Sequence, residues 1–386
     1  MRIFYASGRT PNGAVAGSEI WRKNLYGALV SLGHDVVEFD YDLEPLLAAA
    51  DITVPANREF VERWRPHAEG ALLDQVKRAE EEEHVDLFFS YFYSSCCTAE
   101  TILKIRSMGI KTMNWYCNAS YQLHLVADLA PAYDWCLVPE KYRIEDYKAL
   151  GANPVYFQEA ANPDVYYPRS VSRDLDVTFV GACYRDRPRY IKALADVGID
   201  VRAFGPGWRD PALVKQVESP ADLLRIVRHP GTLKRLAARA YRRAFAPERV
   251  QPVLPRAVCG PVLSDEEMVE MYSRSRISLG FAAVDSGADG RPIKQIRLRD
   301  FEAPMSGAFY MTEYQEEIEE FFEIGKEIVC FTDPDDLVEK CRYYLAHPDE
   351  REAIRLAGLE RARRDHTWQK RFSDLFADLG LGDESR

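Results

Sequence analysis

The sequence has no run of apolar residues that approaches the roughly 18 needed to cross a membrane. It also has no Cys-x-x-Cys pair, no His-Glu-x-x-His, no Gly-x-Ser-x-Gly and no P-loop, so zinc-hydrolase, serine-hydrolase and P-loop classes lose support. A broad excess of basic residues is missing as well, because the formal net charge is −11. We therefore expect no nucleic-acid partner, since a phosphate backbone requires a basic face.

The eight cysteines fall mostly inside apolar, strand-like runs, and we expect them to be buried free thiols. Cys96 and Cys97 are adjacent and could be imagined as a redox pair. Neighbouring residues on a strand point to opposite faces and seldom form a disulfide, which disfavours that alternative. The first residues form a strand pattern, not a signal peptide, and a cytoplasmic location is expected.

What the chain does contain is enough apolar material for two cores: 386 residues, 47% of them hydrophobic. Short β-branched or aromatic runs alternate with longer segments of helical periodicity, which is typical of parallel α/β layers. Strands are predicted at 2–7, 35–40, 85–92, 110–116, 134–139, 154–158, 175–181, 199–204, 276–281, 308–311 and 327–331. Helices are predicted around 17–32, 57–83, 98–108, 140–149, 187–197, 264–274, 298–306, 314–322, 334–346, 349–364 and 367–379.

Two prolines and an Asn-Pro step between Ala160 and Pro168 favour an extended connector between two halves. We predict an α/β chain of two doubly wound, Rossmann-like domains facing across a cleft, where such folds bind ligands. The predicted divisions are an N-terminal acceptor-side domain 1–161, a linker 162–174, a C-terminal donor domain 175–365 and a final helix 366–386 that returns to the first domain.

A basic stretch, residues 209–256, interrupts the alternation with eleven Lys or Arg against four acids. Leu233, Leu236 and Ala240 recur at helical spacing between arginines, as in a basic amphipathic helix. Two interpretations stay open: a solvated helical insertion, or a docking site for an anionic acceptor or a membrane surface.

The strongest local signal is a basic loop that enters a helix at residues 291–307. Lys294, Arg297 and Arg299, together with the free amides of a helix N-terminus, are suited to a diphosphate. Glu302 lies one turn into that helix, where a carboxylate can accept from both hydroxyls of a ribose. The alternative is that Glu302 pairs with Arg299 on an ordinary helix.

Two glycine turns add weaker signals. After the strand at 175–181, Gly181 and Arg185 form a turn resembling those that face phosphates, although a tight turn needs glycine for steric reasons alone. Near the N-terminus, a loop containing Gly17 and Glu19 precedes a helix and could approach a donor phosphate or an acceptor.

These stretches resemble the C-terminal lobe of glycosyltransferases grouped with the spore-maturation protein CgeB, distant relatives of glycosyltransferase family 4. The similarity covers 175–208 and 257–368, including DVTFVGACYRDRPRYIKAL, GIDVRAFGPGW, RLRDFEAPMSGAFYMTEY and HTW, and is looser at AGSEIWRKNLYGALVSLGHDV, KTMNWYCNASY and AANPDVYYP. It implies the GT-B fold and a metal-independent, retaining transfer of a sugar from a UDP- or GDP-type nucleotide diphosphate sugar to an unidentified acceptor, with no cofactor.

The resemblance also implies roles for single residues. Glu302 would bind the donor ribose, and Arg297 and Arg299 would face the diphosphate. The residues that would shape the phosphate site are Ser306, Gly307 and Thr312, and those at the place of the nucleotide base are Pro261 and Val262. Lys294 stands where family 4 has the first glutamate of its Glu-x7-Glu pattern, which weakens any transfer of sugar preference and of the retaining outcome, since that carboxylate normally contacts the sugar.

A catalytic base is not evident. Relatives often have an acid where this chain has Asn118, and an amide does not accept a proton near neutral pH. His124 and Glu19 are the candidates if the reaction inverts; a retaining enzyme can let the departing phosphate take the acceptor proton. Two alternative functions stay open: a non-catalytic nucleotide-sugar-binding protein, and a GT-B sugar-nucleotide epimerase.

Overall fold

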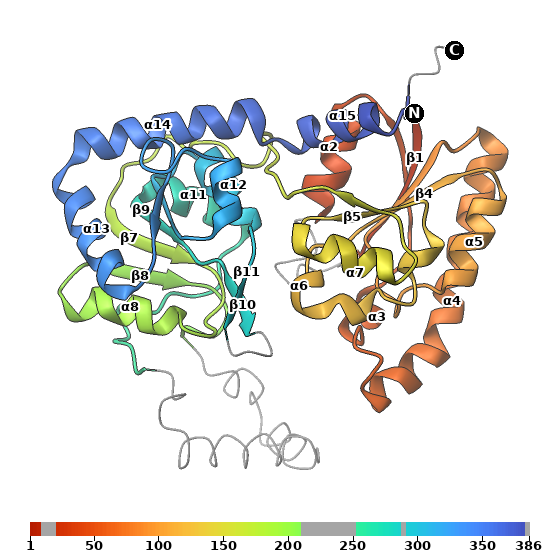
Figure 1. Ribbon diagram of the computed structural model, residues 1–386, viewed down its shortest axis with the longest axis horizontal. Helices are drawn as coiled ribbons and strands as arrows, with labels where there is room; N and C mark the ends of the chain where they lie inside the picture. The colour runs from red at the N-terminus through yellow and green to blue at the C-terminus, as the bar shows by residue number, and fades with distance from the viewer. Residues whose placement is uncertain (9–20, 210–251, 287–290, 383–386) are drawn as a thin grey trace. The chain divides into compact units, whose positions relative to one another are not determined.

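The computed structural model describes residues 1–8, 21–209, 252–286 and 291–382 (Figure 1). The chain forms two compact units. Unit 1 comprises Met1–Tyr167, Val284–Met305 and Glu360–Arg386, and unit 2 comprises Pro168–Ala283 and Ser306–Leu359. The segment 284–305, which the sequence assigns to the C-terminal domain, thus groups with unit 1 because its side chains contact the N-terminal part of the chain.

Unit 1 is built on a six-stranded parallel sheet in the order β2-β1-β3-β4-β5-β6. Its strands are β1 (Arg2–Ala6), β2 (Asp35–Glu38), β3 (Leu87–Ser90), β4 (Lys111–Trp115), β5 (Trp135–Val138) and β6 (Pro154–Tyr156). Each lies inside a strand predicted from the sequence. Strands buried on both faces carry nearly continuous apolar runs, and this is why they were recognisable.

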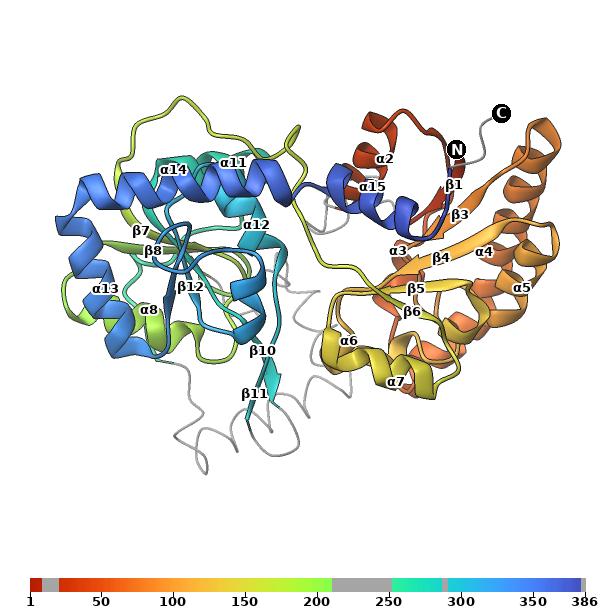
Figure 2. The ribbon, with the colours of Figure 1, turned by 45° about the horizontal axis from the view of Figure 1, so that its top comes forward.

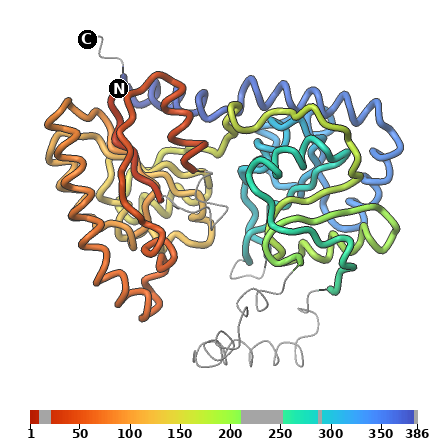
Figure 3. The backbone as a smooth tube through the Cα atoms, turned by 180° about the vertical axis from the view of Figure 1, so that it is seen from behind, coloured from red at the N-terminus to blue at the C-terminus, as the bar shows by residue number. Residues whose placement is uncertain are grey.

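Side chains alternate between two apolar cores along these strands. Phe4 and Phe88 point to one core, which α4 (Pro55–Glu82), α5 (Ala99–Ser107) and α7 (Ile144–Ala149) cover. Tyr5 and Phe89 point to the other, which α2 (Gly27–Ser31) and α15 (Trp368–Asp378) cover (Figure 1). The described chain ends near its beginning, since Met1 and Leu381 both pack against this second core (Figure 3).

Short elements complete unit 1. A π-helix (Arg22–Tyr26) precedes α2, and α3 (Glu44–Ala48), α6 (Ala119–Gln122) and α12 (Leu298–Met305) are further short helices. Single 3₁₀ turns occupy Leu123–Leu125, Ala130–Ala132 and Lys141–Arg143. Two short strands pair before α12: β10 (Ala283–Ser286) precedes the predicted basic loop, and β11 (Pro292–Lys294) lies within it. Both are too short to leave a periodic pattern in the sequence.

Unit 2 has a five-stranded parallel sheet in the order β13-β12-β9-β7-β8. The strands are β7 (Leu175–Val180), β8 (Val201–Phe204), β9 (Ser275–Gly280), β12 (Tyr310–Glu313) and β13 (Val329–Phe331). Val177, Phe179, Leu279 and Met311 face a core covered by α8 (Arg187–Asp196) and α13 (Pro334–Ala346), which lie side by side (Figure 2).

The remaining helices of unit 2 are α11 (Asp265–Arg274) and the first part of α14 (Pro348–Asp365). A helix predicted at 314–322 is wrong in type, because only a 3₁₀ turn, Glu316–Glu320, forms there. Five consecutive residues of this turn include four glutamates, and their repulsion disfavours a regular helix.

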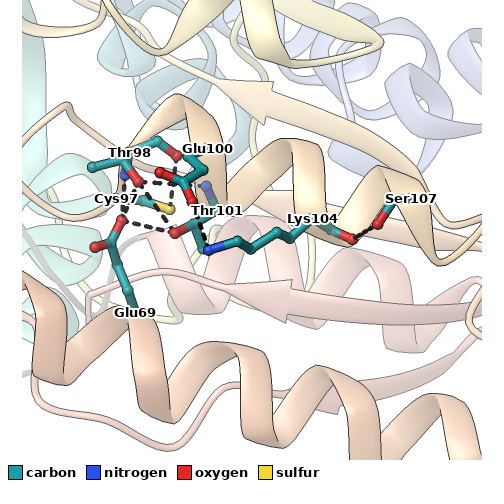
Figure 4. A network of polar contacts seen from close by, with 7 residues as sticks. All are labelled: Glu69, Cys97, Thr98, Glu100, Thr101, Lys104 and Ser107. Atoms are coloured by element: carbon teal, nitrogen blue, oxygen red, sulfur yellow. Dashed lines mark hydrogen bonds and ion pairs between the residues drawn. The ribbon is translucent and has the colours of Figure 1, made fainter.

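All eight cysteines lie in the described part of the chain and are free thiols, as expected, and seven of them are buried. Cys97 adjoins a polar network at the start of α5, in which Glu69 of α4 accepts from the Thr98 amide at 2.7 Å and from the Thr101 hydroxyl at 2.9 Å (Figure 4). Burial raises the pKa of Cys97 well above its ordinary value, so the thiol stays protonated. Among the described residues, no helix is long and apolar enough to cross a membrane.

Candidate functional site

The carboxyl edge of the unit 1 sheet carries a polar group after each of three neighbouring strands. Cys117 and Asn118 follow β4, Glu140 follows β5, and Glu159 follows β6. Because β4, β5 and β6 are parallel and adjacent, their carboxyl ends lie along one edge. In open α/β sheets this edge is where ligands bind.

The segment that enters α12 is bound to the same edge by polar contacts. The Gln295 side-chain amide donates to the Cys117 carbonyl at 3.4 Å, and the Ser120 hydroxyl donates to Gln295 Oε1. Gln295 and Ser120 are both buried, so these contacts fix the loop from within. The start of α12 thereby lies among the residues that follow β4.

The helix begins where it does because Asp300 caps it. The Asp300 carboxylate accepts from the Arg297 amide at 2.7 Å, which satisfies one donor that the helix would leave open. Farther along, the Phe301 ring packs on His366, with 5.2 Å between ring centroids. The Arg371 guanidinium lies 5.8 Å from the centre of the Phe301 ring. The helix is therefore held within unit 1 at its start and at Phe301.

Burial and charge make this edge electrostatically unusual. Glu140, Glu159 and Glu302 are all buried, and the pKa of Glu159 is raised well above its ordinary value. Desolvation is the main cause, the Arg297 guanidinium opposes it, and the carboxylates of Glu302, Glu140 and Asp300 add to it. Burial, and to a smaller extent Glu159 and Glu140, also raise the pKa of the Cys117 thiol.

The structure thus brings several predicted residues into one region and adds others. Arg297 and Glu302 share an electrostatic neighbourhood, and Lys294 and Arg299 lie two or three residues from Arg297 on either side. Glu140, Glu159 and Gln295 are additions that the sequence reasoning missed. The available signal was an acid directly after an apolar strand, in Trp135–Glu140 and in Pro154–Glu159.

The predicted catalytic residues have other surroundings. Asn118 precedes α6, and its side-chain oxygen accepts from the Tyr121 hydroxyl at 3.3 Å. His124 is half exposed, and its Nε2 lies 3.8 Å from a carboxylate oxygen of Asp51. Gly17 and Glu19 lie outside the described residues, as does most of the basic stretch 209–256. Catalytic roles for Asn118, His124 and Glu19 stay predictions.

In unit 2 the predicted turn after β7 is packed against the turn after β8. The Trp208 indole donates to the Gly181 carbonyl at 2.6 Å, and the Gly181 amide donates to the Phe204 carbonyl at 2.7 Å. Arg185 has a φ of 55°, a left-handed conformation that residues other than glycine seldom adopt. Such a conformation persists only where its surroundings impose it, and it occurs often at ligand sites.

Arg187, at the start of α8, contacts the turn that follows β7. Its guanidinium donates to the Ala182 carbonyl at 3.1 Å and lies 3.8 Å from the centre of the Tyr184 ring. At the end of β12, the Glu313 carboxylate accepts from the amides of Ala282 and Ala283, each at 3.1 Å. The Glu313 contacts tie the carboxyl end of β12 to the residues that follow β9.

The other predicted donor residues of unit 2 have structural contacts of their own. Ser306 is buried, and its carbonyl accepts from the Ser273 hydroxyl at 3.1 Å. Gly307 has a φ of 73° after the end of α12, and its carbonyl accepts from Arg173 at 3.0 Å. Thr312 is buried in β12, where the Tyr310 hydroxyl donates to it at 3.5 Å. The Pro261 carbonyl accepts from the Gly205 amide at 2.9 Å, and Val262 is exposed.

Comparison with known proteins gives a family match and a fold. Residues 187–377, just under half of the chain, match the glycosyl transferase-like family. No curated protein matches the chain by sequence. Among solved structures, sucrose-phosphate synthase from Thermosynechococcus elongatus is similar with a TM-score of 0.59 and 12% identity, covering 98% of this chain and 99% of that one.

Two further structures agree. HepE from Anabaena in complex with UDP and glucose has a TM-score of 0.54 and 10% identity, over 98% of this chain and 99% of that one. The α,α-trehalose 6-phosphate synthase from Burkholderia multivorans has a TM-score of 0.56 and 11% identity, over 98% of this chain and 97% of that one. The chain has the GT-B fold, as predicted, and with the family match this supports a glycosyltransferase.

Proposed function

We propose that the protein transfers a sugar from a UDP- or GDP-type nucleotide diphosphate sugar to an acceptor hydroxyl. The observation that carries the proposal is the position of Glu302, buried one turn into α12, beside Arg297 at the start of that helix. A carboxylate and a guanidinium that both act on Glu159 share one neighbourhood, and they suit the ribose hydroxyls and the phosphates of a nucleotide diphosphate. The family match of residues 187–377 supports the same chemistry.

Each group has a chemical task in this proposal. Arg297, with Lys294 and Arg299, stabilises the negative charge that develops on the diphosphate as the bond to the sugar breaks. Glu302 accepts hydrogen bonds from the ribose hydroxyls. The bond from the anomeric carbon to the diphosphate breaks, and the acceptor oxygen forms its bond to that carbon on the same face, so the sugar retains its anomeric configuration. The departing phosphate takes the proton of the acceptor hydroxyl, and no side chain need act as the base. The complex of HepE with UDP and glucose supports a uridine nucleotide.

The finer assignments belong to the same proposal. We place the chain with the CgeB-type transferases, acting in the cytoplasm without a metal ion, on the motifs quoted from residues 175–208 and 257–368. An anionic or membrane-associated acceptor is suggested by the eleven cations of residues 209–256. Lys294, in place of a carboxylate, implies that the sugar contacts differ from those of family 4.

Calorimetric titration with UDP and GDP tests the donor site. Arg297→Gln and Glu302→Gln should each weaken binding by about tenfold to a hundredfold, because each removes a hydrogen bond to or from a charged group. Arg202→Gln is a matched control, since Arg202 pairs with Asp200 on the exposed side of β8. Unchanged affinity in both site variants would contradict the assignment.

Turnover needs a separate measurement. The wild-type protein should hydrolyse its preferred nucleotide sugar slowly without an acceptor, because water can replace the acceptor hydroxyl in an incompletely closed site. A protein that binds the donor without releasing sugar under any condition would be a sensor, and recovery of an isomerised donor would indicate an epimerase.

A further inference from the structure

Glu159 is a buried acid without an evident structural task. It lies three residues after β6, and only 4% of its surface is exposed. Its Oε2 accepts no hydrogen bond from any residue that the structure describes. Its own amide donates to the Gln158 side chain at 2.8 Å, and Gln158 donates in turn to the Pro139 carbonyl at 3.1 Å. The backbone is thus fixed while the carboxyl group is left for another partner.

Two acids near Glu159 each accept a hydrogen bond from a backbone amide. Glu140 accepts from the Ser120 amide at 3.2 Å, and Asp300 accepts from the Arg297 amide at 2.7 Å. A hydrogen bond accepted from an amide favours the charged form of a carboxyl group. A buried carboxyl oxygen that receives no donor is costly as an anion, because no N–H or water replaces its lost hydration.

The charges that face Glu159 come from three parts of unit 1. Cys117 follows β4, Glu140 follows β5, and Arg297, Asp300 and Glu302 belong to α12 and the residue before it. One guanidinium therefore stands among three other carboxyl groups. In these surroundings the neutral acid is the form of Glu159 with the lower free energy, and the raised pKa of Glu159 agrees with this conclusion.

A neutral carboxylic acid offers what its anion cannot, an O–H that donates a hydrogen bond. A diphosphate arriving beside Arg297 would be repelled by an ionised Glu159 but bound by a protonated one. The same principle operates where an apolar site keeps an acid neutral so that it can donate to a developing anion. A buried carboxyl oxygen that receives no hydrogen bond thus has a use in anion binding here.

We propose that Glu159, as the neutral acid, donates a hydrogen bond to the diphosphate of the nucleotide donor, beside Arg297. The inference rests on the proposed function and extends it to a residue outside the matching family segment, which begins at residue 187. If Glu159 donates in this way, the affinity for the donor depends on the proton of its carboxyl group. Binding weakens when Glu159 ionises, by up to tenfold for each pH unit above its pKa.

The test compares the nucleotide affinity of the wild type, Glu159→Gln and Glu159→Ala across neutral and alkaline pH by calorimetry. The glutamine side chain keeps the shape and a donor but cannot ionise, so Glu159→Gln should bind as the wild type does at neutral pH and lose the alkaline decline that is due to residue 159. Glu159→Ala should bind about tenfold to a hundredfold more weakly. Titration of the nucleotide itself is common to all three proteins and cancels in the comparison.

The inference is overturned if Glu159→Gln and the wild type decline in parallel, if Glu159→Gln binds as weakly as Glu159→Ala, or if Glu159→Ala binds normally. Infrared spectroscopy of the ligand-free wild type gives an independent readout that needs no variant: the carbonyl band of a protonated carboxylic acid must be present at neutral pH. Its absence overturns the inference. Failure of the wild type to bind any nucleotide diphosphate would instead refute the proposed function itself.

Discussion

Gly205, in the turn after β8, lies against the turn after β7 and gives the sharpest structural prediction. Gly205 has a φ of +129°, and a Cβ atom added to it would lie 2.6 Å from the Gly181 carbonyl oxygen and 2.8 Å from the carbonyl carbon. Both contacts are to backbone, so no side chain can rotate away. Gly205→Ala therefore imposes two costs, an unfavourable backbone conformation and an overlap with the neighbouring turn.

Gly198→Ala separates these two costs. Gly198 has a φ of +81° after the end of α8, and nothing lies within 4 Å of its added Cβ. The conformational term alone is about 1–2 kcal/mol. Relief of the overlap at Gly205 requires the ends of β7 and β8 to move apart, and the total should reach about 3–5 kcal/mol.

Amide hydrogen exchange shows which part of the structure is destabilised by Gly205→Ala. The Gly181 amide donates to Phe204 at 2.7 Å and the Cys183 amide donates to Pro206 at 2.8 Å, so both should exchange much faster in Gly205→Ala than in Gly198→Ala. Urea denaturation gives the overall loss, and nucleotide titration shows whether the Gly181 turn serves the donor. Equal destabilisation by the two substitutions, with unchanged exchange at residues 181 and 183, would refute the steric argument.

Two further predictions concern burial. Trp368 at the start of α15 is fully buried among Trp115, Phe157 and Phe372. In urea denaturation, Trp368→Ala should therefore destabilise unit 1 by about 3–5 kcal/mol, and Trp368→Phe by clearly less. A loss below about 1 kcal/mol in Trp368→Ala would mean that α15 adds little to this core. Cys183 is the one cysteine that is not buried, and burial of part of its surface raises its pKa to about 11. A thiol reagent should therefore label one site in the folded protein, at a rate that increases about tenfold with each unit of rising pH until the pH reaches that pKa. Cys183→Ser should abolish this labelling, and rapid reaction of several thiols would contradict the burial of the other cysteines.

Most of the fold was predictable because its signals are local. Strands such as Leu87–Ser90 and Leu175–Val180 are short runs rich in apolar residues, and helices such as Pro334–Ala346 begin with clear capping residues, here Asp333. The errors lie where local signals are short or opposed. The two strands at Ala283–Ser286 and Pro292–Lys294 are held by pairing with each other, which no window of sequence displays.

The candidate site was predictable only in part. Lys294, Arg297, Arg299 and Glu302 stand within nine residues, so their common chemistry was visible in the sequence. Glu159 stood out in no motif, because a glutamate after a strand is usually exposed and ionised. Its burial depends on α12 and on the strands beside it, which belong to distant parts of the chain.

By itself, the sequence determined the two parallel α/β units and a concentration of cations before α12, since apolar periodicity and local charge are properties of neighbouring residues. Only the tertiary structure decided which groups surround Arg297. The parallel register of β4, β5 and β6 brings Cys117, Glu140 and Glu159 to one edge, and Gln295 reaches that edge across 178 positions of sequence. Ionisation of a carboxyl group depends on solvent exclusion and on nearby charges, and both arise only when the chain has folded.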